Sequence, residues 1–209
     1  MKKIILLITA SILLVCMTAC AGSQNSGNAS GGSNSSTPKT VYDLLDDLAD
    51  KEYSSIKTDI VTTTDFAELS CNYVLTQGFV TYSVEKLNLL SLDGNITDLS
   101  SDYKTTVSGY AQIKNGQVVE FDGDKDVEFP SYNEIKGNFN FDKSNFKNVV
   151  EGNNSFEADV IFPSKFYGAD VDMSNLKVKV DYTETSLIEI TISYSTTNAT
   201  VVTVYAFEN

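Results

Sequence analysis

The 209-residue sequence contains no histidine, no arginine and no tryptophan, and the first two absences each exclude a class of chemistry. Without histidine there is no Ser-His-Asp or Cys-His catalytic arrangement and no histidine-ligated zinc site. Without arginine there is no bidentate clamp for a phosphate or carboxylate group. Carboxylates, Lys, Tyr, Ser, Thr and Cys remain, and we identify no catalytic residue and no cofactor site among them.

Positive charge is also scarce, because 15 lysines stand against 28 acidic residues and the formal net charge is −13 at pH 7. Nucleic acids and anionic lipid headgroups are bound through basic patches. We therefore expect no nucleic-acid partner. The acidic composition is typical of an ordinary solvated protein surface.

The N-terminal segment has the pattern of a secretory signal. Met1–Lys3 gives a positive start, residues 4–15 are almost wholly apolar, and small residues precede Cys20. A charged start followed by a short apolar stretch is typical of export signals. The stretch is shorter than the roughly 20 apolar residues that a permanent membrane span needs. We therefore expect residues 1–19 to be a signal peptide.

The quartet Met17-Thr18-Ala19-Cys20 resembles the lipobox of bacterial lipoproteins. This resemblance implies that Cys20 becomes the new N-terminus and carries a diacylglycerol, often with a further acyl chain such as palmitate. Two or more acyl chains, at about 0.8 kcal/mol per buried CH₂, anchor a protein stably. The expected location is the extracytoplasmic side of a cell membrane. An ordinary secretory signal without lipid, cleaved after Ala19 or Ala21, is the alternative.

Residues 20–39 and 40–209 differ sharply in composition. After its cysteine, the first segment is nearly all Gly, Ser and Asn, which predicts a flexible tether with a root-mean-square span of about 24 Å. The second is long enough for one β-rich extracytoplasmic domain with its own core. Cys71 has no disulfide partner there, and its place in an alternating run indicates a buried core residue.

One helix is predicted at the start of this domain, followed by strands. Thr40 and Asp43 have the spacing of a capping box, and apolar residues recur at helical spacing over about 40–51. The hydrophobic period then changes to two, which is typical of strands. The clearest inward-facing sets are Leu176, Val178, Val180 and Tyr182; Ile188, Ile190, Ile192 and Tyr194; and Val201, Thr203, Tyr205 and Phe207. The last strand is expected to be buried on both faces.

Turns and looser regions separate these strands. Asn115-Gly116 predicts a hairpin, since both positions of a type I′ turn need positive φ. The looser regions are 87–104 and 130–154, and within the second, residues 144–150 are compatible with one or two helical turns.

These elements predict an α+β fold, with an N-terminal amphipathic helix packed on a large, curved, half-barrel-like antiparallel sheet of eight or nine strands. An all-β sandwich or barrel is the alternative. The order of elements in this lipid-anchored domain resembles that of the LolA/LppX-type lipoprotein carriers. That resemblance implies a half-open barrel with acyl chains between sheet and helices. It rests on element order, so no functional residue is carried over.

Aromatic residues gather in and beside the looser regions and predict the mouth of a site for an apolar or sugar ligand. With two leucines of the expected helix, the candidate lining residues are Leu44, Leu48, Phe139, Phe141, Phe146, Phe166 and Tyr167. Packing of these side chains in the core beneath long loops is the alternative.

The segment Asp122–Asp126 has alternate carboxylates, which suit Ca²⁺. Val127 and Asn133, however, stand where an EF-hand loop needs Gly and Glu. We therefore interpret the segment as a solvated acidic turn and expect no metal site.

These observations favour a non-enzymatic, lipid-anchored protein of the cell envelope that binds a lipid or another apolar ligand, or serves as a docking module. The alternative is a carbohydrate-binding module, or a hydrolase of envelope polymers that uses two carboxylates. With 28 acidic residues and no motif, no catalytic pair can be singled out.

Overall fold

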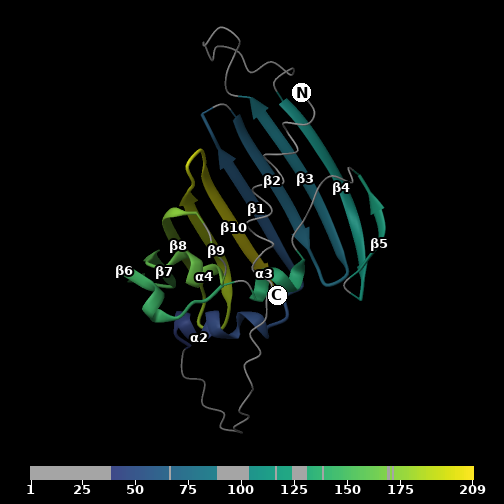
Figure 1. The fold of residues 1–209 in the computed structure, drawn as a ribbon. Helices are drawn as coiled ribbons and strands as arrows, with labels where there is room; N and C mark the ends of the chain where they lie inside the picture. Colours follow the sequence, from purple (N-terminus) through teal and green to yellow (C-terminus); the bar gives the residue numbers. More distant parts are fainter. Residues whose placement is uncertain are drawn as a thin grey trace.

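The computed structural model describes residues 39–65, 67–88, 104–115, 117–123, 131–137, 139–168, 170 and 172–209, and one antiparallel sheet of ten strands forms its centre (Figure 1). The strands are β1 (Ser55–Thr63), β2 (Ala67–Leu75), β3 (Phe79–Asn88), β4 (Lys104–Lys114), β5 (Gln117–Asp122), β6 (Phe146–Gly152), β7 (Ser155–Val160), β8 (Ser174–Tyr182), β9 (Leu187–Ser195) and β10 (Thr200–Glu208). The helices are α2 (Val41–Asp46), α3 (Tyr132–Gly137) and α4 (Pro163–Tyr167), with the 3₁₀ segments η1 (Asp47–Ala49) and η3 (Lys143–Asn145). Among the described residues, no helix is long and apolar enough to cross a membrane.

The sheet consists of two five-stranded meanders that meet at its centre. Its spatial order is β5-β4-β3-β2-β1-β10-β9-β8-β7-β6, so β1 and β10 join the two halves. These two strands are paired from Ser55 opposite Glu208 to Thr63 opposite Thr200. β5 and β6 form the two edges of an open sheet.

Alternating side chains give this sheet one apolar face. Along β1, Ile56 and Ile60 are buried, whereas Lys57 and Asp59 are exposed. Side chains of the helices and of this face belong to one hydrophobic core. Because burial of apolar surface contributes about 25 cal/mol per Å², this shared core is what fixes the short helices on the sheet.

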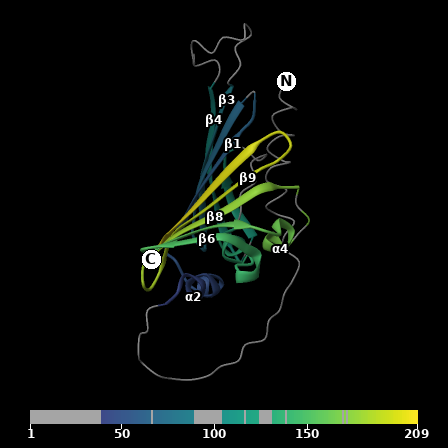
Figure 2. The ribbon, with the colours of Figure 1, turned by 90° about the vertical axis from the view of Figure 1, so that its left-hand side faces the viewer.

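The sheet is strongly twisted, as Figure 2 shows from the side. β6 and β8 run at a steep angle to β3 and β4, which is the accumulated twist expected of a many-stranded sheet. Helices α2 and α4 lie beside the half that contains β6–β9, and β3 and β4 extend beyond them (Figures 1 and 2). Helices α2 and α4 therefore lie on one half of the sheet, whereas α3 lies near the lower ends of the central strands in Figure 1.

Helix α2 begins with the predicted capping box and is shorter than predicted. The Thr40 hydroxyl accepts a hydrogen bond from the Asp43 N–H, and the Asp43 carboxylate accepts one from the Thr40 N–H, 2.8 Å away. The α-helix ends at Asp46 and continues only as η1, whereas the sequence predicts a helix over 40–51. Asp46 and Asp47 lie at its C-terminal end, where negative charge is unfavourable for the helix dipole, and no basic residue lies in its last turn.

The predicted fold class is confirmed in part, for its large antiparallel sheet. The described strands number ten, where the sequence predicts eight or nine, and they form one open sheet, which is not the alternative sandwich or barrel. Short helices are a minor part of this β-rich fold, so it is not clearly the predicted α+β class. The looser region 87–104 lies outside the described residues except for its ends.

The one or two helical turns predicted within 144–150 are confirmed only at the start, because residues 144 and 145 belong to η3 and residues 146–150 to strand β6. Asn148 has a φ of 53°, and the pairing of β6 with β7 shifts between Lys147 and Val150. A bulge adds one residue to a strand and interrupts its alternation. The period of two is therefore not visible in the sequence at this edge.

Two further predictions about the strands can be compared with the structure. β4 and β5 pair as an antiparallel hairpin, and Asn115 has the positive φ of 52° that its turn requires, so this hairpin is confirmed. Gly116 lies outside the described residues. On β10 one face is buried and the other is half-buried at Val202 and Val204. The prediction that both faces of this strand are buried is therefore only partly confirmed.

Candidate ligand-binding groove

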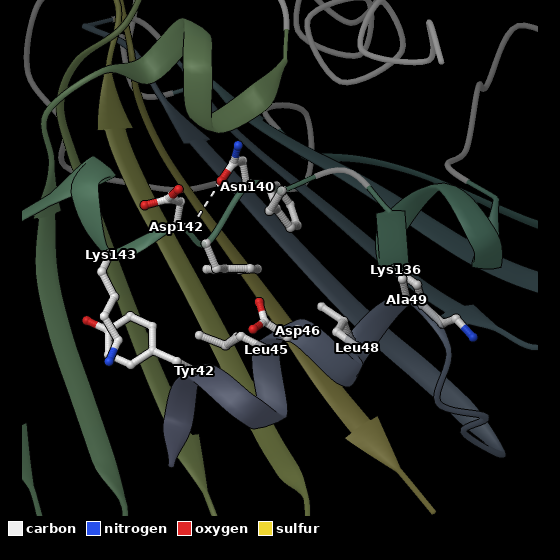
Figure 3. A pocket seen from close by; sticks show the side chains of 11 residues that line it. Tyr42, Leu45, Asp46, Leu48, Ala49, Lys136, Asn140, Asp142 and Lys143 are labelled. Atoms are coloured by element: carbon white, nitrogen blue, oxygen red, sulfur yellow. Dashed lines mark hydrogen bonds between the residues drawn. The ribbon is translucent and has the colours of Figure 1, made fainter. Parts of the chain in front are cut away.

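A groove of about 510 Å³ lies between helix α2 with η1 and the segment 139–143 (Figure 3). The side chains around it come from three short elements of the chain. They are Tyr42, Leu45, Asp46, Leu48, Ala49, Lys136, Phe139, Asn140, Phe141, Asp142 and Lys143. This volume is within the range of small-molecule sites, which is roughly 300–1,000 Å³.

One wall of the groove is a face of helix α2 and η1. Tyr42, Leu45, Asp46 and Ala49 are spaced as i, i+3, i+4 and i+7, which puts them on one side of a helix. Leu44 is buried in the core and does not line the groove. The capped first turn therefore determines which side chains of the helix meet the groove.

The opposite wall is fixed by a network of backbone and side-chain hydrogen bonds. The Asn140 N–H donates to the Phe166 carbonyl at 2.8 Å, and the Asp142 N–H donates to Asn140 Oδ1 at 2.9 Å (Figure 3). Asn145, which is fully buried, donates through Nδ2 to the Asn140 carbonyl at 3.1 Å. These bonds fix an irregular segment in one conformation, so this wall is preorganised.

Aromatic rings behind this wall form a continuous cluster. The Phe139 ring is stacked on Phe166 with their centroids 5.4 Å apart, and it lies 5.6 Å from Tyr167 and 5.8 Å from Phe141. Phe166 is wholly buried. Edge and stacked contacts of this kind each contribute about 0.5–1.5 kcal/mol beyond area burial. The cluster therefore supports Phe139 and Phe141 from behind.

The structure divides the seven predicted lining residues into two groups. Leu48, Phe139 and Phe141 line the groove. The other four lie in the core behind it, and they are Leu44, Phe146, Phe166 and Tyr167. Some of the predicted residues thus line the groove, and others pack in the core as the alternative predicted.

Sequence reasoning missed most of the polar lining residues. Asn140, Asp142 and Lys143 follow one another around Phe141 but carry no motif, and they meet helix α2 only in the folded chain. The helical spacing of Tyr42, Leu45, Asp46 and Ala49 was the available signal for the other wall. The sequence prediction includes only Leu44 and Leu48 from this helix.

Four charged side chains line the groove, and three of them are engaged by neighbours. Lys143 Nζ lies 4.4 Å from the centre of the Tyr42 ring. Lys136, with only 5% of its side chain exposed, donates to the Lys51 carbonyl at 2.6 Å. Asp142 Oδ1 accepts from the Ser144 N–H at 2.8 Å.

Two of the lining groups have shifted pKa values. The hydrogen bond from the Ser144 backbone, followed by that from its hydroxyl, lowers the pKa of Asp142. Burial, and then the Glu151 carboxylate, raises the pKa of Tyr42. A glycosidase acid requires a raised carboxyl pKa, so Asp142 does not have the character of a general acid.

Other candidate groups give no second site among the described residues. Within the part of the chain that the structure describes, no group of three or more Cys, Asp or Glu is placed to bind a metal. The predicted acidic turn lies outside those residues from 124 onward, as does Cys20. Cys71 is buried, and burial raises the pKa of its thiol, which is unfavourable for a reactive cysteine.

Comparison with known proteins adds no relative. No protein-family model matches the chain, and a search of curated proteins finds no match. Proposals about function therefore rest on the residues and on the geometry of the groove.

Proposed function

We propose that this chain is a lipid-anchored, non-enzymatic protein of the cell envelope whose domain binds a small ligand with an apolar part. The observation that carries the ligand proposal is the groove of about 510 Å³ between α2 with η1 and the segment 139–143. The anchor proposal rests on Cys20 and the small residues before it. The tether over 20–39 then places the groove away from the membrane surface.

The shape of the groove favours a small ligand over a pair of long acyl chains. Leu44, Leu45 and Leu48 are each no more than 4% exposed, so the space between the helix and the sheet is filled. A ligand would lie beside the helix, against Phe139 and Phe141. In the proposed arrangement the curved sheet and its helices form a half-barrel whose interior is core and whose helical side provides the site.

Filling the groove with a larger side chain tests the ligand proposal. N-phenyl-1-naphthylamine is a neutral apolar dye whose fluorescence rises in apolar sites. We expect the full chain to bind it through the domain formed by residues 40–209. Ala49→Trp places a ring in the groove from an exposed position and should abolish the rise. Val150→Trp, at a 65% exposed position away from the groove, is the matched control. Equal binding by both variants would contradict the proposal.

Metabolic labelling with palmitate tests the anchor separately. We expect label on the wild-type chain and on Cys71→Ala, and no label on Cys20→Ala. Both variants replace a cysteine by alanine. Cys20→Ala does so at the proposed lipidation position, and Cys71→Ala is the control at a buried core position. Unlabelled wild-type protein, or equal label on Cys20→Ala, would contradict lipid anchoring and would leave the groove proposal in place.

A further inference from the structure

We propose that the groove selects ligands that carry a cationic group next to their apolar part, and that the Asp46 carboxylate binds this group. The inference rests on the proposed function, because it names the chemistry of the ligand for the same site. It comes from the fact that three of the four charged lining residues have partners, whereas the Asp46 carboxylate has none among the residues that the structure describes.

Asp46 lies on the groove face of the helix, between two leucines. Figure 3 shows its carboxylate between Leu45 and Leu48, with Asn140 and Asp142 on the opposite wall. Both leucines are buried, whereas Asp46 itself is exposed at the groove. A ligand that packs on Phe139 would bring a polar end close to Asp46.

Asp46 also differs from the other three charged lining residues in having no described partner. Lys143 is engaged with the Tyr42 ring, Lys136 with the Lys51 carbonyl, and Asp142 with the Ser144 N–H. Among the described residues, the Asp46 carboxylate accepts no hydrogen bond and forms no ion pair. Of the four charged lining residues that the structure describes, Asp46 is therefore the one whose charged group has no existing partner for a ligand to compete with.

The surroundings make a cation the complementary group. Lys136 Nζ is buried and directed to a backbone carbonyl, so it offers little to an anion in the groove. The chain has a formal net charge of −13, which attracts cations and repels anions at a distance. Asp46 is exposed, so its ion pair with a bound cation would be a surface pair that salt weakens.

Three octyl compounds with different head groups test this selectivity. Octylammonium, octyl glucoside and octanoate would compete with the bound dye at pH 7 and low ionic strength, each below its micelle concentration. We expect octylammonium to displace the dye at the lowest concentration. Its advantage over octyl glucoside should be about fivefold and should shrink as salt is added.

Asp46→Asn should remove this advantage and leave binding of the neutral dye unchanged. Asp50→Asn, on an exposed residue one turn later that does not line the groove, is the control and should keep the advantage. The matched pair removes the same charge from the same helical end. Far-UV circular dichroism of both variants confirms that the fold is retained.

The possible outcomes separate the two proposals. Dye binding with no preference for octylammonium, or with a preference for octanoate, overturns the cation inference and leaves the proposed ligand site intact. Equal loss of the preference in both Asn variants overturns the role of Asp46. Absence of dye and octyl binding overturns both proposals together.

Discussion

The ammonium nitrogen of Lys143 lies 4.4 Å from the centre of the Tyr42 ring, and this contact joins the two walls of the groove. Lys143 begins η3, and Tyr42 belongs to α2, about 100 residues earlier in the chain. The Tyr42 ring also meets Phe156 of β7 edge-on at 5.5 Å. One aromatic side chain thus connects the helix, the sheet and the opposite wall.

Loss of this cation–π contact should weaken the fold slightly. We expect Lys143→Ala to lower the free energy of unfolding by about 0.5–1 kcal/mol, the usual value for such a contact at an exposed site. Lys114→Ala, at an exposed position on β4, should change it by less. Urea denaturation measures both. In a Tyr42→Leu background the effect of Lys143→Ala should disappear, and an unchanged effect there would show that the contact is not responsible.

The capping box of α2 provides a prediction that combines stability with pH. Thr40→Ala should lower the free energy of unfolding by about 1 kcal/mol, since it removes the side-chain cap. Hydrogen bonds from Thr40, side-chain first and then backbone, lower the pKa of Asp43 below its usual 3.8.

A lowered carboxyl pKa stabilises the fold above the pKa of the unfolded chain, and this contribution disappears as the pH falls through the folded value. The stability of the wild-type chain should therefore decrease as the pH drops below about 4. Asp43→Asn should show a smaller decrease over the same range in urea denaturation at pH 2–5. Identical pH profiles would indicate that Asp43 does not contribute.

The aromatic cluster behind the groove predicts a large difference between two neighbouring phenylalanines. Phe166 is 0% exposed, and Phe166→Ala should lower the free energy of unfolding by about 3–5 kcal/mol, because it leaves a cavity in the core. Phe162 is 54% exposed, so Phe162→Ala should change it by only about 0.5 kcal/mol. Thermal or urea denaturation separates these values. Similar losses for both would contradict the described packing.

Local alternation was sufficient to predict much of the C-terminal meander. β8, β9 and β10 were expected as successive antiparallel strands, and their pairing confirms this. Ile188 is an exception, because it was assigned to the buried face and is 49% exposed. The pairing of β8 with β9 shifts between Asp181 and Tyr182, and a register shift moves side chains to the other face.

Contacts between distant segments could not be predicted in the same way. The pairing of β1 with β10 and the meeting of helix α2 with residues 139–143 depend on the whole chain closing around one core. Phe139 and Phe141 were found because they are aromatic. In the sequence, Asp46 and Lys143 cannot be distinguished from ordinary surface residues. They line the groove only because the folded chain brings their two segments together.

Tyr53 and Tyr132 contact each other, but the hydroxyl of Tyr132 is hydrogen-bonded and that of Tyr53 has no described partner. Tyr132 Oη donates to the Tyr53 carbonyl at 2.9 Å and accepts from the Tyr53 N–H at 2.8 Å. The hydroxyl of Tyr53 itself is buried and has no hydrogen-bond partner among the described residues. An unpaired buried hydroxyl costs about 1–3 kcal/mol, whereas a paired one is stabilising.

Tyr53→Phe should therefore raise the free energy of unfolding by about 1 kcal/mol, and Tyr132→Phe should lower it by about 1–3 kcal/mol. Burial, followed by the neighbouring Tyr132 and Asp47, raises the pKa of Tyr53 to about 12. Because the folded state favours the neutral phenol, stability should fall as the pH rises from about 10 towards 12, and less so in Tyr53→Phe. Urea denaturation at pH 7 and at pH 9–12 measures both effects. Destabilisation by Tyr53→Phe at pH 7 would mean that this hydroxyl has a partner in solution.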